Sequence, residues 1–321
     1  MKKICLLVLF NHRYDINLPI LDKIYKGGGR FSHVRYIVPF YDGDRDDVIA
    51  VYARSIFFES YIAQAYNVLK KENFDYYYVV ADDMVINPAI NEKNILSFFE
   101  LEEGQSWIPH LRTIKEQKYF WIGTLAAYTY RTKQKYVEAQ GELPTVEEAL
   151  RKFEKQGLEK PMELTRKDVF REMSFKTTYM ADKARLALRL MTKLRHPFRK
   201  SADLSYPLAA SYSDTLLVSG DVMGRFAHYC GVFGATSLFV EVAIPTALVL
   251  ASEMRIKTEK DISKRGRSYW CSAENVFCEH PSYVWEQLEK EYNNLNDMMA
   301  RFPQDAIYLH PVKLSKWMDK R

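Results

Sequence analysis

Short apolar runs alternate with charged segments along the chain, and the runs rich in β-branched or aromatic residues predict strands. The predicted strands cover residues 3–10, 34–40, 76–80, 125–130, 208–212, 215–218 and 237–240. Between the second and third strands, residues 53–71 place apolar side chains at helical spacing, which predicts a helix that crosses over a parallel sheet. The pattern therefore predicts the α/β fold class.

A charged, helix-favouring stretch interrupts this pattern in the middle of the chain. It contains Thr145 and Glu148 at the spacing of a capping box, which predicts the start of a helix. Strands resume near residue 205, and one helix is expected over residues 283–299, ahead of a tail. We therefore expect three parts, namely residues 1–136, a helical insertion at 137–204, and residues 205–321.

Composition is that of an ordinary globular protein. With 321 residues, 47% of them hydrophobic, the chain is long enough to bury a full core. Four scattered cysteines are too few for a disulfide scaffold, so reduced thiols and a cytoplasmic location are expected. Cys271, Cys278 and His280 lack the two-residue spacing of zinc knuckles, and a structural zinc site is not expected.

The first ten residues, MKKICLLVLF, join two lysines to an apolar run, as a secretory signal does. No small-residue cleavage site follows, so we interpret the run as the first buried strand. No other stretch reaches the roughly 20 apolar residues that a helix needs to cross a bilayer. A chain that does not span a membrane is therefore expected.

Positive charge is concentrated in residues 176–200. Eight Lys or Arg stand there against the single Asp182, a net +7, which leaves −2 for the rest of a chain whose total is +5. A basic surface for nucleic acid is therefore not expected. Residues 180–195 carry an apolar stripe at helical spacing, and such a basic amphipathic helix either lies on an anionic membrane surface or packs on the protein core.

The paired carboxylates of Asp82 and Asp83 come directly after the predicted buried strand Tyr-Tyr-Tyr-Val-Val. The carboxyl ends of strands in α/β sheets are where ligands bind. Two adjacent carboxylates repel each other unless a cation lies between them, and a hard divalent ion shared with phosphate oxygens meets that need. The alternative is a helix N-cap at Asp83, although Pro88 argues against a long helix here.

Further polar and aromatic residues follow the first two predicted strands and are expected at the same edge. Phe10 or Tyr41 is suited to cover a base, and Asp42 or Asp44 to accept hydrogen bonds from a base or ribose. Alternatively, Asp42 belongs to a plain turn. The residues expected to line this nucleotide pocket are Phe10, Asn11, Arg13, Tyr41, Asp42 and Arg54, of which Arg54 either meets a diphosphate or is solvated.

Two later segments carry further candidates. Glu241 stands alone in an apolar sequence, where a carboxylate is costly to bury, so it is either a base with a raised pKa or an acid at a helix N-terminus. His310 ends an apolar run, and Lys313 follows three residues later. An imidazole is a suitable ligand for a metal dication, and an ammonium can neutralise a leaving phosphate.

In these features the chain resembles the GT-A type of nucleotide-sugar glycosyltransferase. The resemblance covers residues 1–110 and 205–315, and it implies a Rossmann-type mixed sheet that leaves the helical insertion unexplained. It implies a nucleotide-sugar donor bound by residues 1–136 and an acceptor, a glycan or lipid-linked glycan, bound by residues 205–321. The sequence has Ala-Asp-Asp where that class carries Asp-x-Asp, and it lacks an adjacent Glu-Asp pair at Glu241.

The resemblance also implies roles for individual residues. Asp82, Asp83 and His310 would bind Mn²⁺ or Mg²⁺, with Asp82 and Lys313 also facing the donor. Glu241 would deprotonate the acceptor if the reaction inverts the anomeric centre, which is weakly favoured. The +7 segment would suit a peripheral position on the inner face of a membrane.

Two other functions compete with this one. A sugar-phosphate nucleotidyltransferase would carry a glycine-rich loop after its first strand, where this chain has Asn11 and His12, and residues 27–29 come too late for that loop. A non-catalytic protein could instead use the same fold to dock carbohydrate or membrane partners. Joint stabilisation by a metal ion and a nucleoside diphosphate would distinguish a donor site from both.

Overall fold

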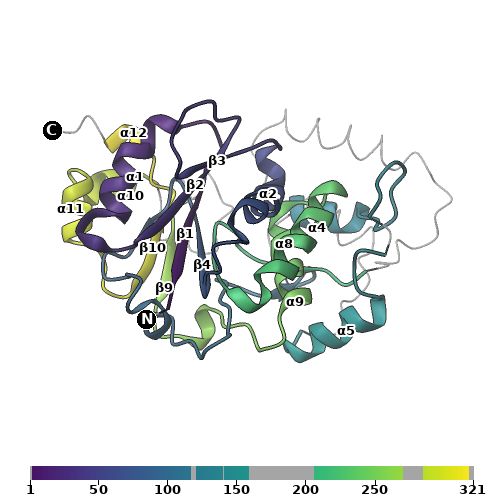
Figure 1. Ribbon diagram of the computed structural model, residues 1–321. Helices are drawn as coiled ribbons and strands as arrows, with labels where there is room; N and C mark the ends of the chain where they lie inside the picture. The colour runs from purple at the N-terminus through teal and green to yellow at the C-terminus, as the bar shows by residue number, and fades with distance from the viewer. Residues whose placement is uncertain (1, 117–120, 140, 159–205, 270–284, 318–321) are drawn as a thin grey trace, which may run out of the picture.

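The computed structural model describes residues 2–116, 121–139, 141–158, 206–269 and 285–317. Its centre is a five-stranded sheet in the order β3-β2-β1-β4-β8 (Figure 1). Four strands run parallel, and β8 pairs antiparallel with β4. Their bounds are β1 Ile4–Leu9, β2 His33–Pro39, β3 Val48–Val51, β4 Tyr76–Ala81 and β8 Thr215–Ser219. The predicted α/β class with a mixed sheet is confirmed.

Both faces of the sheet are buried, because alternate residues of each strand enter two separate apolar cores. Leu7 and Leu9 of β1 pack in one core, and Leu6 and Val8 in the other. The helices of the first face are α2 Glu59–Leu69, α8 Gly220–Ala235 and α9 Val240–Ala251. Those of the second are α1 Leu18–Tyr25, α10 Trp285–Glu291 and α11 Leu295–Ala300 (Figure 1).

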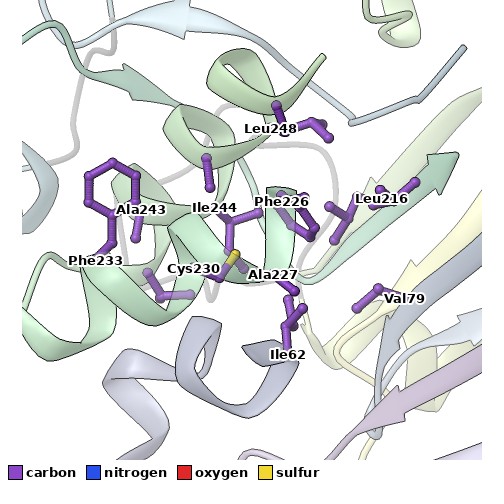
Figure 2. Packing of buried hydrophobic residues seen from close by; sticks show 14 of the residues in the cluster. Ile62, Val79, Leu216, Phe226, Ala227, Cys230, Phe233, Ala243, Ile244 and Leu248 are labelled. Carbon is purple, nitrogen blue, oxygen red and sulfur yellow. The ribbon is translucent and has the colours of Figure 1, made fainter. Parts of the chain in front are cut away.

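On the first face, α8 packs against both α2 and α9. Figure 2 shows Phe226 and Cys230 of α8 between Ile62 of α2 and Ile244 of α9. Gly234 of α8 permits this close approach, because a side chain there would overlap the Ser60 hydroxyl. Apart from Glu241 in its first turn, the helix α9 is buried along its whole length, as expected for a helix enclosed by the core.

The second face also holds a small sheet in the order β5-β10-β9. Its strands are β5 Val85–Ile86, β10 Ala306–His310 and β9 Arg265–Ser268. The strand β5 directly follows the end of β4, and β10 pairs antiparallel with it. This pairing brings the end of β10 to the carboxyl edge of the main sheet. The other elements are α3 Ile95–Phe98, β6 Arg112–Thr113, α4 Trp121–Thr129, α5 Val146–Lys155, β7 Ala209–Ala210 and α12 Leu314–Trp317.

Several predicted elements differ from the structure. Residues 125–130 and 237–240 were expected as strands, but the first lie mostly in the helix α4, and the second run into the start of α9. Short apolar runs do not distinguish buried helices from buried strands, because both lack a polar face. The helix expected at 283–299 is divided into α10 and α11, and β3 was not predicted.

The predicted capping box is confirmed at the start of α5. The Thr145 hydroxyl accepts a hydrogen bond from the Glu148 amide at 3.2 Å, and the Glu148 carboxylate accepts one from the Thr145 amide at 2.9 Å. Residues 159–205, with the basic segment, lie outside the described residues, as do Cys271, Cys278 and His280. The three-part division and the membrane contact stay predictions. Among the helices described, none is both long and apolar enough to span a bilayer.

Glu59 is an unusual member of the first core. It begins α2, is 0% exposed, and faces Gly234 of α8. Neither of its carboxylate oxygens has a hydrogen-bond partner in another described residue. Burial raises the pKa of Glu59 well above its ordinary value, because the charged form loses its hydration.

We predict that Glu59→Gln makes the free energy of unfolding less dependent on pH. Above about pH 4.3 the unfolded chain releases a proton that the folded chain keeps, so wild-type stability falls as pH rises, by up to about 1.4 kcal/mol per pH unit. The glutamine has no proton to release. Urea unfolding at pH 5 and pH 8 should show that the free energy of unfolding of the variant, relative to that of the wild type, is higher at pH 8 than at pH 5.

Glu147→Gln is the matched control, since Glu147 lies in the first turn of α5 and is exposed. Its stability should follow the wild type at both pH values. If the free energy of unfolding of Glu59→Gln depends on pH in the same way as that of the wild type, Glu59 is ionised in the folded protein and the prediction is wrong.

Candidate functional site at the carboxyl edge of the sheet

Four parallel strands end at one edge of the main sheet, and most of the predicted site residues follow them there. Asn11 comes after β1, Tyr41 after β2, Arg54 after β3 and Asp82 after β4. The antiparallel β8 begins at this edge, because Thr215 pairs with Val80. The fold therefore collects residues from distant parts of the chain at one place.

Asp82 connects the tips of β1 and β4. Its amide donates to the Leu9 carbonyl at 2.9 Å, and its carboxyl accepts from the Asn11 amide at 3.3 Å. Burial, followed by the charge of neighbouring Asp83, raises the pKa of Asp82 to about 8. The side chain is thus directed to the β1 tip.

Asp83 instead meets His310, which lies 227 positions later. The His310 Nε2 is 2.8 Å from the Asp83 Oδ1, and the Val312 amide donates to the Asp83 carbonyl at 2.5 Å. Burial alone would raise the pKa of Asp83, but His310 lowers it below its ordinary value. Burial would lower the pKa of His310, and the Asp83 charge raises it instead. Each group therefore stabilises the charge of the other.

Two residues to which sequence reasoning gave no role lie next to this contact. The Tyr212 hydroxyl is hydrogen-bonded to His310 Nδ1. The Asp214 carbonyl accepts from the Ala81 amide at 2.9 Å, burial raises the pKa of Asp214, and its charge contributes to raising the pKa of His310. Both residues come directly before β8. The signal in the sequence that could have identified them was the predicted strand that follows them and begins at the site edge.

The residues present suit a divalent cation only in part. Of the three predicted metal ligands, the structure joins Asp83 and His310, whereas Asp82 faces Asn11. Across the described ranges, no group of three His, Cys, Asp or Glu is arranged to hold a metal ion. A hard dication takes about six ligands, so a carboxylate and an imidazole fit a cation that completes its shell with phosphate oxygens and water.

On the nucleotide side, the structure changes the aromatic assignment. Phe10 is fully buried, with its ring edge-on to Tyr36 at 6.3 Å, so it is not available to cover a base. Both faces of the sheet are covered, and a residue at the end of β1 is enclosed on either side. The aromatic side chains exposed at this edge include Phe40 and Tyr52, at 57% and 66%, with ring centroids 5.6 Å apart.

The polar residues predicted for the nucleotide pocket follow the first three strands of the main sheet. Arg13 forms an ion pair with Asp42, which joins the tips of β1 and β2. The Tyr41 phenol lies over Gly43, where any side chain would overlap it. Arg54 is exposed, with its guanidinium 5.6 Å from the Phe57 ring centroid.

Glu241 and Lys313 complete the predicted set. Glu241 is partly buried in the first turn of α9, the helix N-terminal position that was the alternative, and its carbonyl accepts from the Ser211 amide at 3.1 Å. That places it beside the segment that leads to Asp214. Lys313 is exposed, and its charge contributes to lowering the pKa of Asp83.

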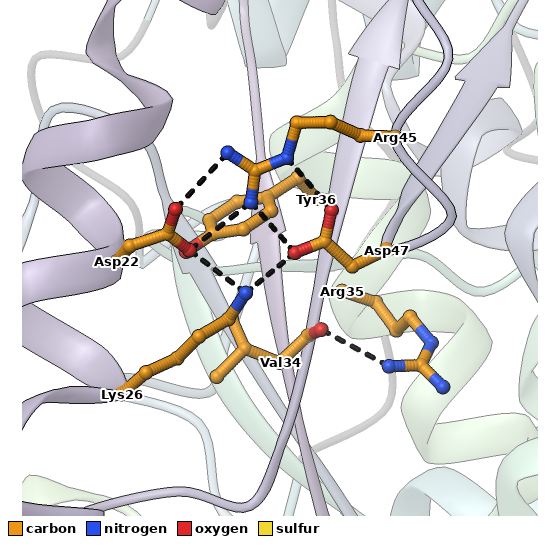
Figure 3. A network of polar contacts seen from close by, with 7 residues as sticks. All are labelled: Asp22, Lys26, Val34, Arg35, Tyr36, Arg45 and Asp47. Atoms are coloured by element: carbon orange, nitrogen blue, oxygen red, sulfur yellow. Dashed lines mark hydrogen bonds and ion pairs between the residues drawn. The ribbon is translucent and has the colours of Figure 1, made fainter.

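A network of ion pairs fixes the loop between β2 and β3, which carries Tyr41 and Asp42. Arg45 lies 3.0 Å from Asp22 of α1 and 2.7 Å from Asp47 (Figure 3). Lys26 contacts the same two carboxylates, at 2.8 and 2.5 Å. Because α1 packs on the sheet, the network holds the loop against a rigid part of the fold.

No protein-family model and no curated protein matches the sequence. Among solved structures, a similarity is found to core-mannan synthase A from Aspergillus fumigatus in its Mn/GDP form. The sequences are 10% identical, and the match covers 81% of this chain and 73% of that one, with a TM-score of 0.36. A TM-score at this level indicates only a loose similarity of fold, so the residues at the carboxyl edge of the sheet are the basis for a functional proposal.

We predict that Asp47→Asn destabilises the protein at neutral pH but not in acid. Burial alone would raise the pKa of Asp47, but Arg45 and Lys26 lower it to about 2. A depressed carboxyl pKa adds stability above the unfolded value of about 3.9, and that stability is lost as pH falls towards 2. The variant should lose about 1 kcal/mol at pH 6, with the difference shrinking below pH 4 in urea unfolding.

Asp46→Asn is the matched control, because Asp46 is an exposed residue of the same loop. It should track the wild type throughout. A deficit of Asp47→Asn that is equal at pH 6 and pH 3 would contradict the ionic origin of the effect.

Proposed function

We propose that the protein is a metal-dependent glycosyltransferase that moves a sugar from a nucleotide-sugar donor to a glycan or lipid-linked glycan acceptor. One observation carries the proposal. Asp83 and His310, a carboxylate and an imidazole from distant parts of the chain, lie 2.8 Å apart at the carboxyl edge of a parallel sheet. This is an arrangement suited to a cation that also binds a diphosphate.

Asp83 and His310 would hold Mn²⁺ or Mg²⁺. When bound, the cation would supply positive charge to the diphosphate that leaves the sugar. Because two protein groups do not fill its shell, the diphosphate and the cation should bind together. Asp82 would support the site indirectly. Its carboxyl accepts from the Asn11 amide and would so hold the tip of β1 next to the site.

The remaining edge residues would bind the donor. Lys313 and Arg54 are exposed cations suited to phosphate oxygens, and the Arg13–Asp42 pair would open to let Asp42 accept from a base or ribose. Phe40 and Tyr52 would offer aromatic faces to the base, in place of Phe10. Lys313 follows β10, and the other residues follow the three adjacent strands β1, β2 and β3, so one nucleotide could reach all of them.

Glu241 would serve as the base that deprotonates the acceptor, in a reaction that inverts the anomeric centre. Glu241 lies in the first turn of α9, beside Ser211 and the segment that leads to Asp214. This place supports a position on the acceptor side of the site. In this position the helix dipole favours the ionised carboxylate that a base requires.

We predict that Mn²⁺ and a nucleoside diphosphate together raise the melting temperature more than the sum of their separate effects. A ligand at a hundred times its Kd adds about 2.7 kcal/mol to the free energy of unfolding. GDP, UDP, ADP and CDP would each be tested with and without Mn²⁺. Asp83→Asn should abolish the joint shift, because it removes a negative charge from the cation site.

Asp305→Asn is the control for that measurement, since Asp305 is an exposed acid just before the opposite end of β10 from His310. It should keep the joint shift. A folded Asp83→Asn protein with the wild-type shift would disprove the metal site.

A second prediction concerns Glu241→Gln, which keeps the shape of the side chain and removes its basicity. Hydrolysis of the donor, with water as acceptor, should slow by about 10²- to 10⁴-fold, while the Kd of the donor changes little. Sugar release and equilibrium binding would be measured side by side. Equal losses in affinity and rate would favour a structural role for Glu241.

A further inference from the structure

A chain of hydrogen bonds extends behind the proposed cation site. The Asp83 carboxylate meets His310 Nε2 at 2.8 Å, and His310 Nδ1 meets the Tyr212 hydroxyl. These three residues come from three separate segments, namely the end of β4, the end of β10 and the approach to β8. The metal-site proposal assigns no task to Tyr212.

The position of Tyr212 is itself well determined. Its ring stacks on Tyr308 of β10, with centroids 6.0 Å apart and planes 14° from parallel. It also meets the His310 ring edge-on at 5.7 Å. Because Tyr308 and His310 are alternate residues of one strand, the phenol rests on the same face of β10 as the imidazole that it contacts.

An imidazole presents either nitrogen when its ring flips, and either nitrogen can carry the hydrogen. A hydrogen-bond partner on one nitrogen decides which nitrogen is left for a metal. Here the Tyr212 hydroxyl occupies Nδ1 and leaves Nε2 facing Asp83. The 2.8 Å contact is a hydrogen bond from Nε2–H to the Asp83 carboxylate, so a cation that binds both groups would take the place of that hydrogen. The Tyr212 oxygen can accept from Nδ1–H and so keep the other hydrogen on Nδ1.

We propose that Tyr212 is a positioning residue that holds His310 with Nε2 directed to the cation. The inference rests on the proposed function, since it needs a cation at Asp83 and His310. It adds one residue to the site that does not touch the cation or the donor.

The test is Tyr212→Phe, which keeps the ring that stacks on Tyr308 and removes the hydroxyl. The Kd of Mn²⁺, measured by calorimetry or by the electron paramagnetic resonance signal of free Mn²⁺ with a saturating nucleoside diphosphate, should rise about 10- to 100-fold. Nucleotide affinity without metal should change by less than about twofold, because the hydroxyl faces the imidazole and not the donor. A merely structural role would not separate these two affinities.

Tyr206→Phe is the matched control. The Tyr206 hydroxyl donates to the Pro144 carbonyl at 3.0 Å, so the variant loses one tyrosine hydrogen bond elsewhere. Its Mn²⁺ affinity should equal that of the wild type. If Tyr212→Phe does not fold, Tyr308→Leu tests the same arrangement, because it removes the ring on which Tyr212 stacks, and weaker Mn²⁺ binding is again expected.

The outcomes separate the two proposals. A wild-type protein that shows no joint binding of Mn²⁺ and any nucleoside diphosphate overturns the proposed function, and the role of Tyr212 with it. A wild-type protein that binds both, with an unchanged Mn²⁺ Kd in the folded Tyr212→Phe variant, leaves the function standing and overturns the positioning role. The same holds for an unchanged Kd in the folded Tyr308→Leu variant.

Discussion

The contact between His310 and Asp83 joins the first third of the chain to its C-terminal part, and the geometry of the site depends on it. A fully buried imidazole and a carboxylate at the edge of the core would each be costly to desolvate alone. Paired at 2.8 Å, they offset that cost, and the backbone hydrogen bond from Val312 to Asp83 adds a second contact. The end of β10 is thereby held at the end of β4, and the small sheet closes the second face.

The same edge is left for ligands because both faces of the main sheet are occupied. On the first face α8 approaches α2 closely at Gly234, and on the second α1 and β10 cover the strands. Polar groups at the strand ends thus have solvent on one side and rigid elements on the other. The ion pairs of Arg45 extend this rigidity to the loop that carries Asp42.

Within this frame, the two aspartates after β4 take different parts. Asp82 faces inward to the Asn11 amide, and Asp83 faces His310. The side chains of adjacent residues point in different directions after a strand. The Asp82 carboxylate can therefore connect the strand tips while the Asp83 carboxylate remains at the site. Glu59, in the opposite core, shows what burial does when no other described residue offers a partner, because burial raises the pKa of its carboxyl.

Local sequence determined the strands β1, β2, β4 and β8, the helix α2 and the cap at Thr145, because hydrophobic runs and capping residues act over a few positions. It also placed Asp82 and Asp83 at the end of a buried strand. Tertiary structure alone decided that residues 125–129 are helical, that Phe10 is enclosed, and that Tyr212 and Asp214 reach His310. Those outcomes depend on which faces become covered and on contacts between residues about a hundred or more positions apart, and no local pattern encodes such contacts.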